Sequence, residues 1–198
     1  MIRTDISRED IIKIRKQAIE LTNQMWIKLK PYIEKENKIN RALTGKPLTE
    51  NEIREELRPE WTALIDKNFN LVSPRYGFDS SYMVISKPIK VTSPKPYSIG
   101  YIHYHPINKL EPSVRDIMSW IARYTVGEYL FCIHTDEKTR CYTFKNIEDK
   151  KTFEDLLYSS SFQIAVLFGV SDKEKNKIKN WFNRMIEDGK IKIIEAGR

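Results

Sequence analysis

The sequence predicts an α+β domain of three layers, in which a mostly antiparallel or mixed sheet lies between helices. Apolar residues recur at three- and four-residue spacing near both ends of the chain, as in amphipathic helices. The middle is rich in Val, Ile, Thr and Tyr, separated by Pro, Gly and Asp clusters, as in strands. Helical segments also interrupt and follow the strands, an order typical of such domains. The 198 residues, of which 40% are hydrophobic, suffice for one domain with a sizeable core.

The first segment, residues 1–48, is predicted to be an amphipathic helical extension. Its helix begins after Ser7 and runs from residue 8 to about 30, with one apolar stripe made of Ile11, Ile14, Ala18, Leu21 and Met25. Residues 31–48 contain two prolines and a glycine, which predict a short continuation and then a loop. The stripe is compatible with three roles: covering a cleft, binding a protein partner, or self-association.

Residues 49–198 are predicted to form the main domain. Thr49 and Glu52 form the pattern of a capping box, which opens a short helix that Pro59 should end. Three strands are expected next, in the segments "EWTALID", "SYMVISKPIKVTS" and "SIGYIHYH". The segment "IMSWIARY" then has the apolar spacing of a helix.

A hairpin is expected from "EYLFCIHT" and "TRCYTF", which flank a turn at Asp136 and Glu137. Cys132 and Cys141 are symmetric about that turn, so the hairpin would set them opposite each other, where a disulfide could form. Two small buried thiols are the favoured alternative, because disulfides are rare inside cells except in hyperthermophiles.

The last part of the chain is predicted to contain a helix and a closing strand. The segment "FEDLLYSSSFQIAVLF" is ambiguous between helix and strand. Ser171 and Glu174 then form a second capping-box pattern, opening a helix that should stop at Gly189. The segment "KIKII" follows as the expected strand.

The formal net charge of +7 allows nucleic acid or an acidic protein as a partner. The charges are dispersed in helices of mixed sign, so solvated faces are favoured over a nucleic-acid track. No apolar run approaches the roughly 18 residues of a membrane helix, and the first ten residues are too charged for a signal peptide. We therefore expect an intracellular, cytoplasmic protein without a membrane partner.

The segment "GYIHYHPINKLEPSVRD" predicts a metal site. Alternation along a strand places His103 and His105 on one face, where both imidazoles can converge on one ion. Ser113 begins a helix and Asp116 lies in its first turn, so a returning loop could add Asp116 as a third ligand. Two histidines and a carboxylate leave tetrahedral zinc one open position, as in catalytic sites. The alternative is a half-buried pair of strand histidines followed by an ordinary helix cap.

The stretch "HYHPINKLEPSVRD" resembles the JAMM (MPN-plus) metalloprotease motif, His-x-His-x7-Ser-x-x-Asp, including Pro106 and Pro112. Tyr104 stands where many members carry Ser or Thr, but alternation turns it away from the metal. The resemblance implies a JAB/MPN-like (cytidine-deaminase-like) domain over residues 49–198, with a curved sheet flanked by helices and one zinc ion. It also implies hydrolysis of peptide or isopeptide bonds, commonly the removal of ubiquitin-like proteins from lysine.

By this resemblance, zinc is held by His103, His105, Asp116 and a water molecule, while Ser113 assists the oxyanion. The motif also requires an upstream glutamate as base. Glu60 resembles it most, because it begins a predicted strand and a small residue and aliphatic residues follow. Glu55 and Glu56 on the short helix are alternatives, as is a degenerate site without a base.

The sequence as a whole therefore predicts a zinc-dependent metallopeptidase of JAMM type, with a deubiquitinase-like activity on a ubiquitin-like protein or its conjugate. Two other functions are weighed against it. A non-catalytic MPN-type scaffold would keep the sheet without the metal. A nucleic-acid-associated protein would use the positive charge.

Overall fold

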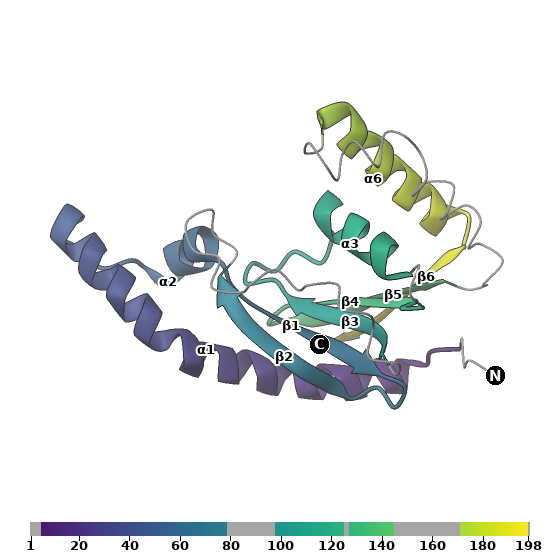
Figure 1. Cartoon of the computed structure of the whole chain (residues 1–198), viewed down its shortest axis with the longest axis horizontal. Coiled ribbons are helices and arrows are strands. Elements are labelled where there is room, and N and C mark those ends of the chain that lie inside the picture. The colour runs from purple at the N-terminus through teal and green to yellow at the C-terminus, as the bar shows by residue number, and fades with distance from the viewer. Residues whose placement is uncertain (1–4, 79–97, 125–126, 145–170, 198) are drawn as a thin grey trace.

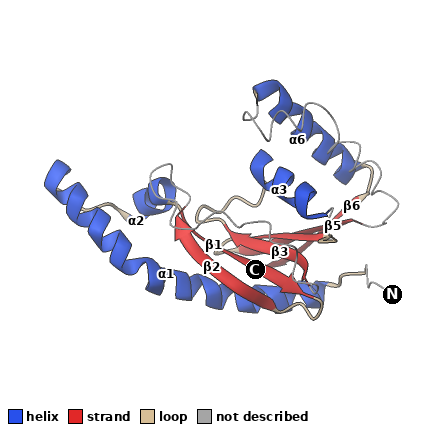
Figure 2. Ribbon diagram, in the orientation of Figure 1, coloured by secondary structure: helices blue, strands red, loops and turns tan. Residues whose placement is uncertain are grey.

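The computed structural model describes residues 5–78, 98–124, 127–144 and 171–197. Within these residues the chain is a mixed α+β structure of three layers, as predicted (Figure 1). An open six-stranded sheet lies in the middle, with the long helix α1 on one face and the helices α3 and α6 on the other (Figure 2). The two faces carry separate hydrophobic cores.

The sheet is mostly antiparallel, with strand order β2-β1-β3-β4-β5-β6. Only the neighbours β3 and β4 run parallel; the other four pairs are antiparallel. The strands are β1 (Pro59–Asp66), β2 (Leu71–Phe78), β3 (Ser98–Tyr104), β4 (Leu130–His134), β5 (Lys138–Phe144) and β6 (Ile191–Gly197). A parallel pair needs a crossover connection, and α3 (Val114–Tyr124) lies on that connection between β3 and β4.

Helix α1 (Arg8–Thr44) is longer than the sequence predicted. Its start is as expected, because Ser7 and Asp10 form a capping box, and its end is capped by Gly45 at φ 79°. For residues 31–48 the sequence predicted a short continuation and then a loop; the helix continues through Pro31 as far as Thr44, so the predicted loop is wrong up to that residue. Pro31 is exposed, so the carbonyl that loses its helical hydrogen bond can be solvated by water instead.

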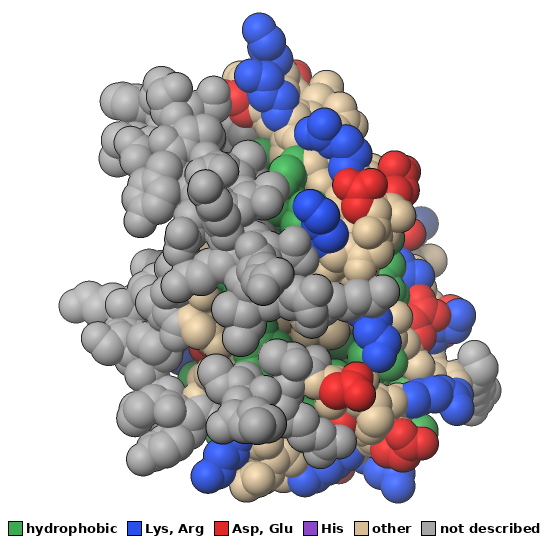
Figure 3. Space-filling view, turned by 90° about the vertical axis from the view of Figure 1, so that its right-hand side faces the viewer, with side chains coloured by type: hydrophobic (Ala, Val, Ile, Leu, Met, Phe, Trp, Pro, Cys, Tyr) green, Lys and Arg blue, Asp and Glu red, His purple; other side chains and the backbone are tan. Residues whose placement is uncertain are grey.

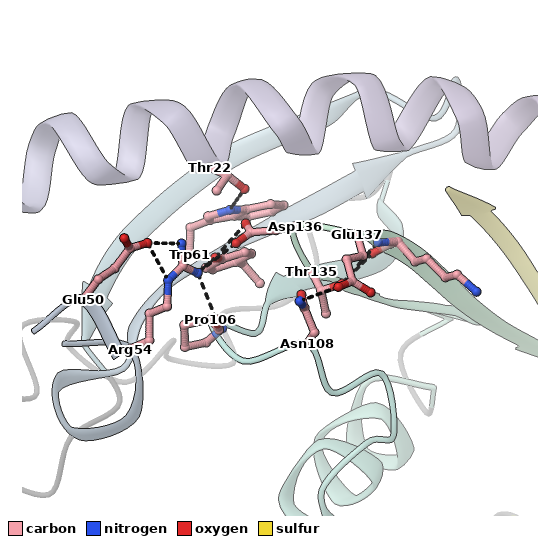
Figure 4. Close-up of polar contacts among 11 residues, drawn as sticks. Thr22, Glu50, Arg54, Trp61, Pro106, Asn108, Thr135, Asp136 and Glu137 are labelled. Atoms are coloured by element: carbon pink, nitrogen blue, oxygen red, sulfur yellow. Dashed lines mark hydrogen bonds and ion pairs between the residues drawn. The ribbon is translucent and has the colours of Figure 1, made fainter. Parts of the chain in front are cut away.

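The apolar stripe of α1 packs against the sheet, and a buried polar contact fixes its position. The indole nitrogen of Trp61 in β1 donates to Thr22 Oγ1 at 2.9 Å, and this hydroxyl donates to the Ala18 carbonyl (Figure 4). The stripe is formed by Ile11, Ile14, Ala18, Thr22, Met25, Leu29 and Ile33. The far end of α1 projects past the sheet, where Ile39 and Leu43 are exposed (Figure 1).

The short helix after α1 also follows the prediction. Its α-helical turn α2 (Glu50–Glu52) begins with the capping box of Thr49 and Glu52, and the wider turn η1 (Ile53–Leu57) follows. Arg58 adopts a left-handed conformation, φ 48°, directly before Pro59. This turn delivers the chain into β1.

The predicted C-terminal helix and strand are confirmed by α6 (Asp172–Glu187) and β6. Ser171 and Glu174 form the expected capping box. Helices α3 and α6 bury their apolar faces on the same side of the sheet, where Trp120 stacks on Phe144 and meets the edge of Phe182. This second core supports the surface that carries the candidate site.

Strand β2 was not predicted. It contains Pro74 and Gly77, and three of its eight residues are exposed. It lies at the edge of the sheet, where proline is tolerated. Its pairing with β1 is interrupted by a register shift between Thr62 and Leu64. The predicted strand at residues 81–93 and the ambiguous segment at 153–168 lie outside the described residues.

Cys132 and Cys141 form a disulfide, so the favoured interpretation of two buried thiols is wrong. The two residues are direct partners in the antiparallel ladder of β4 and β5, as the symmetry about the turn required. Both are fully buried. The sequence could define this pairing but not the oxidation state.

His134 at the end of β4 is buried, and its Nδ1 lies 2.8 Å from Thr139 Oγ1. Burial, reinforced by Arg15 and opposed by Asp136, lowers the pKa of His134 to about 4. The unfolded chain therefore binds this proton at a higher pH than the folded chain does, and folding stability falls as the pH drops from about 6.5 towards 4.

Between pH 7 and pH 5, titration of His134 should lower the unfolding free energy of the wild type by about 2 kcal/mol. We expect this part of the pH dependence to be absent in the variant His134→Gln. Gln keeps a polar partner for Thr139 but does not titrate. Urea unfolding of both proteins at the two pH values measures the difference. Identical pH dependence in the two proteins would contradict a depressed pKa at His134.

None of the helices in the described part of the chain combines the length and the apolar character needed to cross a membrane. Figure 3 shows one side of the molecule, on which Lys and Arg side chains are interspersed with Asp and Glu over the described residues. This side therefore carries no continuous field of one sign.

Candidate metal centre

Alternation along β3 separates the residues of the motif between the two faces of the sheet, as predicted. Tyr104 belongs to the core beneath α1, where its ring stacks on Trp61. His103 points to the other face and contacts the rings of Tyr101 and Phe131. It is buried, with only 7% of its surface exposed.

His105 follows directly after β3 and is held by two hydrogen bonds. Its backbone N–H donates to the His134 carbonyl at 2.8 Å, which continues the pairing with β4. Its Nδ1 lies 2.7 Å from the Lys109 carbonyl oxygen. A carbonyl can only accept, so Nδ1 carries a proton, and Nε2 is the ring nitrogen that faces His103 Nε2 at 2.8 Å. This is the second-sphere arrangement typical of metal-binding histidines.

Asp116 in the first turn of α3 both caps the helix and faces the histidines. Its Oδ2 accepts from the Ser113 backbone N–H at 2.7 Å, and its own N–H donates to Ser113 Oγ at 3.1 Å. Oδ1 lies 3.6 Å from His103 Nε2, and Oδ2 lies 3.7 Å from His105 Nε2. The sequence left open whether Asp116 caps the helix or faces the histidines as a possible metal ligand. In the structure its carboxylate does both.

The three side chains could hold a single metal ion, because one ligand atom from each lies within 4.8 Å of the other two. The Nε2 atoms of His103 and His105 are 2.8 Å apart, and the carboxylate oxygens lie 3.6 and 3.7 Å from them. Ligand atoms about 2.0 to 2.1 Å from a tetrahedral zinc ion lie about 3.3 Å from each other, so a bound ion would require the two Nε2 atoms to separate slightly and one carboxylate oxygen to approach them. Among the described residues, these three side chains form the group that could hold a metal.

The environment of His103 favours the neutral form that a metal requires. Burial lowers the pKa of His103 to about 4; His105 lowers it further and Asp116 opposes the shift. At neutral pH the ring therefore carries no charge. Its position between buried aromatic rings leaves the Nε2 edge facing the cavity.

A cavity of about 320 Å³ opens beside the three side chains, and Glu60 lines it. The pairing of β1 with β3 sets Thr62 opposite His103. In an antiparallel pair, moving two residues back along β1 corresponds to moving two residues forward along β3. Glu60 therefore lies opposite His105, on the same face of the sheet as Thr62 and His103. Glu55 and Glu56, the alternatives, lie on η1 and are not among the residues that line the cavity.

Ser113 also lines the cavity and is exposed to it. Its Oγ accepts the N–H of Asp116, so the hydroxyl proton remains available to a further acceptor. The structure thus brings all five predicted residues to one cavity: Glu60, His103, His105, Ser113 and Asp116.

Arg54 is a site residue that the sequence did not indicate. From η1 its guanidinium donates to the Pro106 carbonyl at 3.0 Å and to Asp136 at 2.8 Å, besides pairing with Glu50 (Figure 4). It also donates to the Tyr104 hydroxyl. Because Pro106 follows His105 directly, Arg54 ties the turn that carries this ligand to the β4–β5 hairpin.

In the sequence, Arg54 and Glu50 have only the spacing of an exposed i,i+4 pair on a helix. The contacts with Pro106 and Asp136 depend on tertiary structure and leave no local signal. We expect Arg54→Ala to weaken zinc binding about ten-fold, the lower end of the usual effect of outer-sphere partners. Calorimetric zinc titration measures this, with Arg41→Ala on α1 as the control. Unchanged affinity in Arg54→Ala would rule out a positioning role.

Comparisons of the chain with protein-family models, with curated proteins and with solved structures give no match. The function must therefore be inferred from the residues around the cavity.

Proposed function

We propose that the chain is a zinc-dependent metallopeptidase of JAMM type that hydrolyses peptide or isopeptide bonds, with a ubiquitin-like protein or its conjugate as the expected substrate. The observation that carries the proposal is the convergence of His103, His105 and Asp116 on one point, next to Glu60 in the same cavity. A JAB/MPN-like fold is part of the proposal. It is supported by the mixed sheet with helices on both faces and by the position of the motif across β3 and α3.

When bound, zinc would supply a water of lowered pKa and a Lewis acid for the scissile carbonyl. Glu60 would accept the proton of the attacking water and deliver it to the leaving amine. General acid-base transfer of this kind contributes about 10²- to 10⁴-fold to the rate. Ser113 would donate its hydroxyl proton to the oxyanion that forms as the carbonyl is attacked.

A non-catalytic scaffold of the same fold is disfavoured by the complete set of ligands. Such a protein would not need the Nδ1 bond of His105 to the Lys109 carbonyl, or the carboxylate of Asp116 facing two imidazoles. Zinc content distinguishes the two functions. We expect one zinc ion per chain, measured by mass spectrometry after metal removal and reloading.

The activity is tested with zinc-loaded and metal-free protein on ubiquitin-like fusions, both linear and lysine-linked. We expect cleavage by the zinc-loaded protein, its loss with a chelator, and its return when zinc is restored. Electrophoresis and mass spectrometry of the products locate the cleaved bond. A zinc-replete protein that leaves every fusion intact would contradict the proposed substrate class, and a protein that binds no zinc would contradict the whole proposal.

A further inference from the structure

A second hollow of about 960 Å³ continues from the metal cavity between α3, α6 and the strands β5 and β6. The two hollows adjoin, because they share lining residues. The shared residues are Arg58, Lys109, Glu111, Ser113 and Arg115. A chain whose scissile bond lay at the zinc ligands could therefore extend along this second hollow, which we call the α6 groove.

The lining of the α6 groove is strongly cationic. Glu111 is its single acidic residue among the described ones, against six basic residues: Arg58, Lys109, Arg115, Arg140, Lys175 and Lys179. Arg140 is paired with Glu195, and Lys175 is paired with Asp172 at 3.1 Å. The other four make no ion pair within the described parts of the chain. Within the described residues, the groove therefore presents an excess of positive charge beside the metal cavity.

The rest of the lining fits a polypeptide better than a nucleic acid. The lining also contains the apolar residues Ile186 and Ile193, which are partly buried and exposed, respectively, and the buried residues Val114, Ile117 and Phe182. Ile193 is 38% exposed and offers a contact for an apolar side chain. Binding of single-stranded nucleic acid usually depends on exposed aromatic rings for stacking. The two aromatic rings in the lining, Tyr142 and Phe182, are 1% and 4% exposed, so they are not available.

We propose that the α6 groove binds an acidic, extended segment of the substrate polypeptide. The inference rests on the proposed function, since it takes the metal cavity as the place of hydrolysis, and it specifies the substrate class. Carboxylates of the bound segment would pair with Arg115 and Lys179 on the groove wall, and its apolar side chains would contact Ile193. A basic segment would be disfavoured by repulsion from the same residues.

Binding can be tested without turnover. A fluorescein-labelled decapeptide of alternating Glu and Leu is titrated with metal-free protein, and polarisation is measured at 50 mM and 300 mM salt. The matching Lys and Leu peptide is the charge control. We expect the acidic peptide to bind at least ten-fold more tightly than the basic one at low salt, and to weaken as salt screens the charges.

Helix α6 supplies a matched pair of variants. Lys175→Glu with Lys179→Glu reverses two charges in the groove, whereas Lys173→Glu with Lys177→Glu makes the same change on exposed residues outside its lining. We expect the first pair to weaken the acidic peptide about five-fold or more, and the second pair to have little effect. Circular dichroism verifies that both variants keep their helix content.

The inference would be overturned if the acidic and basic peptides bound with equal affinity, or if both double variants lost the same affinity for the acidic peptide. It would also be overturned if a ten-nucleotide single-stranded DNA bound more tightly than the acidic peptide and its binding were lost in the groove variant. Its failure is distinguishable from failure of the proposed function. Hydrolysis of fusions without binding of the acidic peptide removes the groove assignment alone. Binding without hydrolysis of any fusion by the zinc-replete protein removes the proposed ubiquitin-like substrate class and leaves the groove.

Discussion

Replacement of Glu60 by Gln is expected to lower kcat/KM for a cleaved fusion by at least about 100-fold while zinc binding stays as in the wild type. The amide has the shape of the carboxylate but cannot take a proton from the attacking water. Because Glu60 is not one of the three residues that could hold the metal, the zinc content should be unchanged. Turnover and bound zinc are measured on the same preparation.

The matched controls are Glu55→Gln and Glu56→Gln, which make the same change on η1, outside the lining of the cavity. We expect both to keep wild-type turnover. A fully active Glu60→Gln protein would remove Glu60 from the mechanism. Loss of turnover in Glu56→Gln instead would assign the base to η1 and would require this turn to move toward the metal ligands.

The grouping of the three candidate metal ligands could be predicted from sequence because local rules place them. Strand alternation puts His103 and His105 on one face, and the helix start fixes Asp116 in its first turn. Local rules are not sufficient to predict the position of Glu60. It reaches the cavity through the pairing of β1 with β3, which is a contact between distant segments of the chain. Its selection depended on the family resemblance, and the register of the sheet gives a physical reason for it.

Other features could not be predicted, each for a specific reason. Helix α1 continues through Pro31 because the missing hydrogen bond lies at an exposed position, and exposure is not a local property of the sequence. Strand β2 was not predicted because Pro74 is unfavourable in most strands, although an edge strand tolerates it. Arg54 looked like half of a surface ion pair, although its partners Pro106 and Asp136 come from distant segments.

Asp116 performs two tasks at once, and this has an energetic consequence. Its carboxylate is held by the Ser113 N–H, so the oxygens that face the histidines are already oriented before any metal binds. Before a metal binds, the Nε2 atoms of His103 and His105 face each other at 2.8 Å and can share one proton in a hydrogen bond, whereas a cation could bind both nitrogens and the carboxylate. Zinc binding should therefore stabilise the fold, through this one junction of β3 and α3.

Asp116→Asn is expected to lose this stabilisation. The amide oxygen can still accept from Ser113, so the helix cap is kept, but the negative charge that balances the metal is gone. In the wild type, zinc at about 1,000 times its dissociation constant should add roughly 4 kcal/mol to the unfolding free energy, and most of this should be absent in the variant. Thermal unfolding with zinc and with chelator measures the gain.

Ser113→Ala is the complementary control for this test, because it removes the hydroxyl from the cap and leaves all three ligands. It should cost about 1 kcal/mol of stability with or without zinc, while the gain on adding zinc is kept. The two variants thus separate capping from metal binding, although both act on the same first turn of α3. If Asp116→Asn were stabilised by zinc as strongly as the wild type, Asp116 would not be a ligand, and the site would reduce to a histidine pair beside a capped helix.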